Sequence, residues 1–194
     1  MSAADVFEKH IYDVIHREIT GVADEDTSDI YALSFWVYAD EDDPRRQVVD
    51  FNYNTTSKAK DAEEDASDPD EAKWNFAFWL QNEVVLIGDE DDTAGSDLRS
   101  AWLNERGLNY TDEDEESDSD RCMELAEQID DEFWQMCARV GRRLHDAGVI
   151  SSKFAKPIPI IIHNLEYDDE GAAITRDANP VGVVDEFVKW VDEM

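Results

Sequence analysis

The chain has 194 residues, a length typical of one domain. Forty-nine Asp and Glu residues against 17 Lys and Arg give a net charge of −32, yet 42% of the residues are hydrophobic and six are Trp. That hydrophobic content excludes a disordered acidic chain. The charge argues against nucleic acid and anionic membranes as direct partners, because phosphate binding needs clustered Lys and Arg. It favours a basic partner, or a solvent that rewards surface acid.

The expected compartment is the cytoplasm. Residues 1–10 lack the apolar core of a signal peptide, and no apolar run approaches the roughly 20 residues of a membrane span. Cys122 and Cys137 are both expected in one long helix, where their separation would be about 22 Å. A disulfide needs Cα atoms within about 7 Å, so we expect two free thiols that pack as small core residues.

The first part of the chain predicts a helix followed by a β-hairpin. Apolar residues recur at helical spacing over residues 3–20, and Gly21 is a stop signal. Residues 30–38 (IYALSFWVY) are β-branched and aromatic, which is typical of a mostly buried strand. Residues 47–53 alternate between apolar and polar, and the acidic turn at residues 40–44 connects the two strands into an antiparallel hairpin.

The middle of the chain is less clearly patterned. Residues 73–80 (KWNFAFWL) are rich in aromatic residues, and both a strand and a short helix remain open because strict alternation fails. Residues 83–87 predict a short strand. Residues 98–106 predict a short helix, with Ser96 or Asp97 as its N-cap.

The strongest periodic signal lies in the second half. Apolar residues step by three and four over residues 120–147, which predicts a long helix ended by Gly148. Residues 157–165 predict a last strand whose prolines suit its beginning, and residues 183–191 predict a closing amphipathic helix. Hairpin strands followed by helices indicate an α+β fold, in which an antiparallel or mixed β-sheet is covered by helices in a single domain spanning residues 1–194.

Five acidic runs stand out because they hold 27 of the 49 acidic residues and no Lys or Arg. We expect them to be loops at residues 40–43, 61–71, 89–97, 112–120 and 166–170. Two interpretations stay open, namely solvated loops and a negative surface that recognises a basic protein. The candidate partner-binding residues come from the densest run and from the hairpin tip, and are Asp112, Glu113, Asp114, Glu115, Glu116, Asp118, Asp120, Asp40, Glu41, Asp42 and Asp43.

No motif for catalysis or metal binding is present. Runs starting at Asp89 or Asp112 lack the glycine at position six that an EF-hand needs. The His and Cys residues lack zinc spacing, and His163 is the His expected to be buried, in a structural role. Nucleophile elbows and phosphate-binding glycine loops are also missing. We therefore expect no enzyme, no metal and no cofactor.

The large aromatic residues are expected mainly in the core, because such side chains dominate core packing. One or two of them are candidates for interface anchors, where Trp and Tyr are favoured. The set consists of Trp36, Trp74, Phe76, Phe78, Trp79 and Trp102.

Several short segments, in order, resemble the bacterial domain-of-unknown-function family numbered 4303. They are residues 30–38, the pair Asn54-Thr55, the Trp-centred residues 73–79, a long helix ending at Gly148, the apolar residues 158–162 and the pair Asn179-Pro180. The resemblance extends from about residue 3 to residue 190. It departs from the family pattern where Thr56 rather than Glu follows the Asn-Thr pair, and where the Trp segment is more apolar.

Families of this kind look like immunity proteins of bacterial polymorphic toxin systems. The resemblance implies a protein that binds and neutralises a cognate toxin domain without chemistry of its own. The charge agrees, because toxin nucleases are often basic and an acidic inhibitor associates quickly with a basic domain. Two alternatives stay open. One is a soluble protein whose acidity, with 29 Asp to 20 Glu and only seven Lys, is adaptation to high salt. The other is an acidic mimic of nucleic acid.

Overall fold

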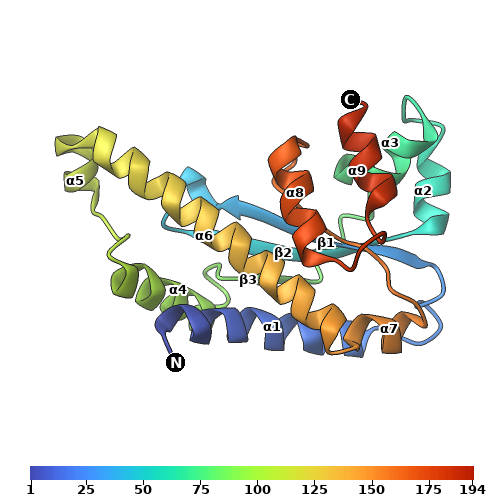
Figure 1. Cartoon of the computed structure of the whole chain (residues 1–194), viewed down its shortest axis with the longest axis horizontal. Helices are drawn as coiled ribbons and strands as arrows, with labels where there is room; N and C mark the ends of the chain where they lie inside the picture. The colour runs from blue at the N-terminus through green and yellow to red at the C-terminus, as the bar shows by residue number, and fades with distance from the viewer.

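A four-stranded β-sheet in the order β3-β2-β1-β4 forms the centre of the computed structural model, which describes residues 1–194 (Figure 1). Strands β1 and β2 pair antiparallel, as do β2 and β3, whereas β4 runs parallel to β1. The strands are β1 (Ile30–Ala39), β2 (Gln47–Thr55), β3 (Val85–Ile87) and β4 (Ile160–His163). The predicted α+β class with a mixed sheet is therefore confirmed.

Nine α-helices and two 3-10 turns surround this sheet (Figure 1). The helices are α1 (Ala3–Gly21), α2 (Thr56–Ala62), α3 (Pro69–Trp74), α4 (Thr93–Arg106), α5 (Asp112–Ser117), α6 (Ser119–Asp146), α7 (Val149–Phe154), α8 (Asp169–Ala178) and α9 (Asp185–Asp192), and the 3-10 turns are η1 (Asp40–Asp42) and η2 (Phe76–Phe78). None of the helices combines the length and the apolar composition needed to span a bilayer. Cys122 and Cys137 both lie in α6 as free, buried thiols, as predicted.

The larger core lies between one face of the sheet and helices α1, α4 and α6. Alternate residues of β1, such as Leu33 and Phe35, point into it because side chains alternate across a strand. Phe133 of α6 is fully buried there, with its ring centroid 5.9 Å from that of Phe7 in α1 and 6.2 Å from that of Trp102 in α4. The strong periodicity of residues 120–147 thus reflects one apolar face of α6.

A smaller aromatic core covers part of the opposite face of the sheet. Trp74 of α3, Phe76 of η2 and the following Trp79 pack there with residues of α9, including Phe187 and Trp190. The Trp74 and Phe187 ring centroids lie 5.8 Å apart in an edge-to-face arrangement. The aromatic segment of residues 73–80 is therefore the end of a helix followed by a 3-10 turn, not a strand.

Strand β4 lies at the edge of the sheet, and two side chains of α8 and its C-cap occupy its free backbone groups. Thr175 Oγ1 accepts from the Ile162 N–H (3.0 Å) and donates to the Ile162 carbonyl (3.1 Å). The Asn179 amide accepts from the Ile160 N–H (2.9 Å) and donates to the Ile160 carbonyl (2.7 Å). Such covering protects an edge that could otherwise pair with another chain. Asn179, the first residue of the Asn-Pro pair in the family resemblance, thus has a structural role here.

Helix α4 starts five residues earlier than predicted. Its N-cap is Asp92, whose carboxylate accepts from the Gly95 N–H (3.1 Å), so neither Ser96 nor Asp97 is the cap. The acidic run before it contains too few apolar residues to show the first turn as a periodic pattern. The other predicted helices and strands begin and end within three residues of the observed bounds.

The acidic runs are not simply loops, which corrects the prediction. Residues 112–120 form α5 and the first residues of α6, and the runs at residues 61–71, 89–97 and 166–170 each overlap a helix. The physical reason is that carboxylates near a helix start accept hydrogen bonds from its free N–H groups and interact favourably with its dipole. Much of the acid is therefore built into helix starts.

Candidate partner-binding surface

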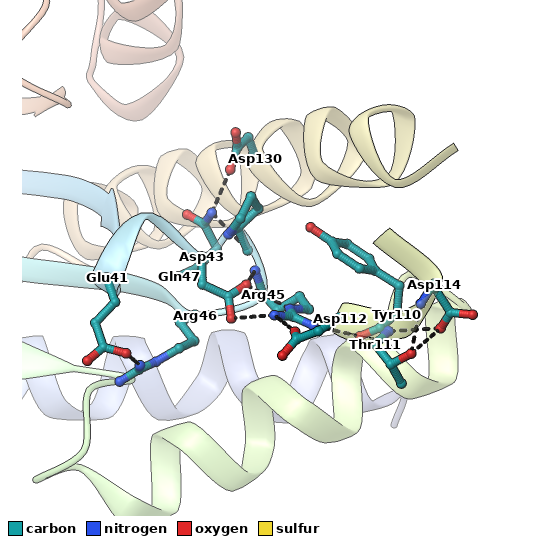
Figure 2. Close-up of polar contacts among 11 residues, drawn as sticks. Glu41, Asp43, Arg45, Arg46, Gln47, Tyr110, Thr111, Asp112, Asp114 and Asp130 are labelled. Carbon is teal, nitrogen blue, oxygen red and sulfur yellow. Dashed lines mark hydrogen bonds and ion pairs between the residues drawn. The ribbon is translucent and has the colours of Figure 1, made fainter. Parts of the chain in front are cut away.

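The structure brings together the two acidic runs that the sequence singled out. Arg45 donates from Nε and Nη2 to the two carboxylate oxygens of Asp43 (2.7 and 2.9 Å), and its Nη2 also donates to Asp112 Oδ1 (2.8 Å) (Figure 2). The same guanidinium lies 4.8 Å from the Tyr110 ring centroid and donates to the Tyr110 carbonyl (3.0 Å). Arg45 thus joins the connection after β1 to the start of α5.

The two arginines at the hairpin tip form ion pairs with carboxylates of the same chain. Arg46 forms ion pairs with Asp40 and Glu41, next to the pair of Arg45 with Asp43. Partial burial alone would raise the pKa of Asp43, but its hydrogen bonds with Arg45 hold that pKa below the ordinary value. Three of the four predicted acidic residues at the hairpin tip therefore form ion pairs within the chain, and only Asp42 makes none.

Two more of the predicted residues form hydrogen bonds at helix starts. Asp114 forms a capping box with Thr111 at the start of α5, and its hydrogen bonds with Thr111 lower its pKa (Figure 2). Asp118 accepts from the Arg121 N–H (3.4 Å) as the N-cap of α6. These carboxylates already accept hydrogen bonds from backbone N–H groups, so they are less available to a partner.

The remaining acids of this run form a group that we call the acidic tip. Its members are exposed and make neither a side-chain hydrogen bond nor an ion pair, and they are Glu113, Glu115, Glu116 and Asp120. Helix α5 lies at one end of the molecule, far from α9 (Figure 1). The exposed side chain of Met123 (56%) follows Asp120 in α6, so an apolar contact is available beside the charge.

A second acidic feature is concave and was not predicted. A cleft of about 510 Å³ lies between α6 and the start of α8, and we call it the acidic cleft. It carries five carboxylates and no Lys or Arg, with two apolar side chains among them. Its lining residues are Glu127, Asp130, Asp131, Trp134, Gln135, Asn164, Asp168, Glu170, Gly171 and Ile174.

Hydrogen bonds fix the position of both walls of the acidic cleft. Asp168 caps α8 by accepting from the Gly171 N–H (2.8 Å), which places the first turn of α8 at the cleft. A Cβ atom at Gly171 would lie 3.8 Å from the Trp134 ring, so the missing side chain leaves room beside that ring. Asp130 accepts from the Gln47 amide (2.5 Å), which ties α6 to the start of β2 (Figure 2).

The sequence contained a partial signal for this cleft. Helix α6 has no Lys or Arg between Arg121 and Arg139, and Glu127 and Asp131 lie four residues apart on its surface. Helix α8, which forms the other wall, was not predicted because it buries mostly small residues. The cleft therefore depended on a helix that periodicity could not reveal.

Buried His163 and Ser34 form a contact that resembles part of a catalytic dyad. Ser34 Oγ lies 2.8 Å from His163 Nε2, and His163 Nδ1 accepts from the Leu165 N–H (3.3 Å). Burial lowers the pKa of His163 to about 3, so the ring is neutral. Because Nδ1 accepts, Nε2 carries the proton and donates to Ser34, which means that His163 is not a base for Ser34. The expected structural role of His163 fits this geometry.

Comparison of the chain with protein-family models, curated proteins and solved structures gives no significant match.

Proposed function

We propose that this protein is an immunity-type inhibitor that binds a basic toxin domain and neutralises it without catalysis. The observation that carries the proposal is the acidic cleft between α6 and α8, which presents five carboxylates with no cation of the chain's own among them. The resemblance to immunity-type families supports the same function. The candidate site residues at the acidic tip supply additional charge outside the cleft.

The acidic cleft suits a Lys or Arg side chain of the partner. Glu127, Asp131 and Glu170 make no ion pair within the chain, so their charge is available. Concave sites lined by one sign of charge focus the electrostatic field and raise the association rate of an oppositely charged partner. The half-buried Trp134 ring adds a surface on which a cation can rest.

The acidic tip has a different role in this proposal. Its carboxylates are exposed, and exposed ion pairs contribute little affinity. They instead attract the basic domain over a distance of about one Debye length, roughly 8 Å at physiological salt. The cleft thus holds the partner, whereas the tip accelerates the encounter.

The test is a growth assay in which the chain is co-expressed with the toxin domain encoded beside its gene. A cleft variant carries Glu127→Gln, Asp131→Asn and Glu170→Gln. Protection should be lost, and the affinity of the purified pair should fall by at least about tenfold, because partner charges lose their counterparts.

A matched control removes the same three charges elsewhere. Glu63→Gln, Glu64→Gln and Asp65→Asn change exposed residues of the 61–71 run that make no ion pair. The control should protect cells as well as the unchanged chain does. Equal loss in both variants would show that only bulk charge matters, and full protection by the cleft variant would overturn the assignment of the cleft.

A further inference from the structure

A second candidate for cation recognition lies on the face of the sheet opposite the larger core. The strand register places Asp50 of β2 between Trp36 of β1 and Leu86 of β3, and Trp36 is in turn paired with His163 of β4. Tyr38 lies two residues after Trp36 on the same face, with ring centroids 4.9 Å apart. One carboxylate thus stands beside two aromatic rings.

Asp50 has no counterpart for its charge. Its side chain is almost fully buried, with the residue 1% exposed, and its Oδ1 has no hydrogen-bond partner. It takes part in no ion pair, and the charged side chain that acts on it is Glu83, which has the same sign. Burial raises the pKa of Asp50 to about 6, and the nearby Asn52 amide offsets this only in part.

Fold stability does not account for a carboxylate at this position. Two neighbouring polar side chains on the same face are paired, since Ser34 contacts His163 and Asn52 accepts from the Glu83 N–H (2.7 Å). A buried, unpaired carboxylate lowers stability relative to a neutral residue of similar size. Groups retained in spite of such a cost are typical of functional sites.

The surroundings of Asp50 point to a cation as the missing partner. Trp36 and Tyr38 are half-buried, so each ring keeps an accessible part. Burial and the carboxylates of Asp50, Asp40, Asp89 and Glu83 together raise the pKa of Tyr38, which shows that the potential here is negative. A guanidinium group matches both features, because it is planar, stacks on aromatic rings and pairs with carboxylates through two N–H groups.

We infer that Trp36, Tyr38 and Asp50 form a recognition site for the guanidinium group of an arginine presented by the basic partner. This inference rests on the proposed function, and it names a second anchor beside the acidic cleft. The two are linked through β4, because Asn164, which lines the cleft, directly follows His163, the register partner of Trp36.

Binding at this site has a spectroscopic signature. Because Asp50 is 1% exposed, an incoming guanidinium reaches the carboxylate only when a covering side chain moves, and Trp36 is the register partner of Asp50 on the neighbouring strand. The indole N–H signal of Trp36 should therefore shift on binding. The acidic tip contains no aromatic side chain, so diffuse binding there leaves this signal unchanged.

The experiment is an NMR titration of the full, isotope-labelled chain with N-acetyl-L-arginine amide at about 0.15 M salt, where long-range attraction is screened. N-acetyl-L-citrulline amide, which has nearly the same shape without the charge, serves as the neutral probe. The arginine probe should shift the Trp36 indole signal and the backbone amides of Tyr38 and Asp50 saturably. The citrulline probe should not.

Asp50→Asn should weaken binding of the arginine probe by at least about tenfold, as expected from loss of a charge-assisted hydrogen bond. Asp65→Asn, which removes the same charge from an exposed side chain of the 61–71 run that makes no ion pair, should leave binding unchanged. Trp36→Leu keeps the carboxylate and should also weaken binding, which provides a second variant that does not alter charge. Equal effects of Asp50→Asn and Asp65→Asn, or equal shifts by both probes, would overturn the inference.

The outcomes separate this inference from the proposed function. A chain that binds the arginine probe at Trp36 but fails to protect cells has the site and lacks the immunity function. A chain that protects cells but shows no shift at Trp36 has the function and lacks this anchor.

Discussion

The unpaired carboxylate of Asp50 leads to a prediction about stability. The pKa of Asp50 is raised from 3.8 to about 6 in the folded chain. The folded state therefore binds a proton more tightly than the unfolded state, and the free energy of unfolding falls as pH rises from about 4 to 6. Above pH 6 the carboxylate is ionised in both states and the full penalty is present. Below pH 4 it is protonated in both states and the penalty vanishes.

Asp50→Asn removes this penalty while nearly preserving side-chain volume. A shift of about two pKa units corresponds to roughly 3 kcal/mol at 1.36 kcal/mol per unit, which is an upper bound. The Asn amide is itself desolvated, so we expect a gain of about 1–2 kcal/mol at pH 7. The gain should shrink as pH falls through 6 and should be absent or reversed below pH 4.

The assay is urea unfolding of the unchanged chain and the variant at several pH values between 4 and 8. The difference between the two chains cancels the titration of the many other carboxylates. Asp65→Asn is the matched control, and its difference from the unchanged chain should stay small across this range because its carboxylate is exposed and makes no ion pair. A stability difference for Asp50→Asn that does not depend on pH, or a destabilisation at pH 7, would refute the reasoning.

Three further predictions concern the core, the sheet edge and α5, all measured by denaturant unfolding. Phe133→Ala should cost about 3–5 kcal/mol, because a fully buried ring is lost, and a near-neutral result would place this face of α6 outside the core. Asn179→Ala should cost about 2–3 kcal/mol and should most reduce hydrogen-exchange protection at Ile160, whose N–H loses its acceptor. Deleting residues 113–117 should change stability by no more than about 0.5 kcal/mol, whereas Asp118→Ala should cost about 1 kcal/mol because it removes the N-cap of α6. A loss of several kcal/mol on the deletion would show that α5 is part of the folded core.

The sequence allowed the elements with a large apolar face to be predicted. The strands of the hairpin and helix α6 carry many β-branched, aromatic or regularly spaced apolar residues, and both appear close to their predicted bounds. Helix α8 escaped prediction because its buried residues include Gly171, Ala172, Thr175 and Ala178, which carry little hydrophobic signal. Its position follows from hydrogen bonds to the edge of β4, which only the folded chain reveals.

The candidate surface was predicted in part. The densest acidic run is exposed, as expected of a solvated segment, but three of its seven acids serve as caps or ion-pair partners. The Thr111–Asp114 spacing is a capping pattern that the sequence could have shown. The bridge through Arg45 could not be predicted, because it joins Asp43 to Asp112 and depends on the packing of distant elements. The unpaired carboxylate of Asp50 could not be predicted either, because it depends on which residues the sheet register places beside Asp50.

The last prediction concerns salt, and it separates partner recognition from adaptation to a saline solvent. With a net charge of −32, repulsion between exposed carboxylates opposes compaction, and the Debye length falls to about 3 Å at 1 M salt. Salt should therefore raise stability somewhat in either case, so a small rise does not discriminate.

The two cases differ in what the chain does at low salt. A solvent-adapted protein would be largely unfolded at 0.1 M salt and would fold only near molar salt. We expect the opposite, because the larger core contains 30 buried residues and eleven ion pairs of Lys or Arg counter part of the acid. We expect a folded chain at low salt, measured by circular dichroism. The association rate with the toxin domain should fall steeply with salt, from about 10⁸–10⁹ toward 10⁵–10⁶ M⁻¹s⁻¹. A chain that is unfolded at 0.1 M salt and folds at 2 M would contradict this expectation whatever its gene neighbour encodes, because its acid would then serve hydration and not a partner.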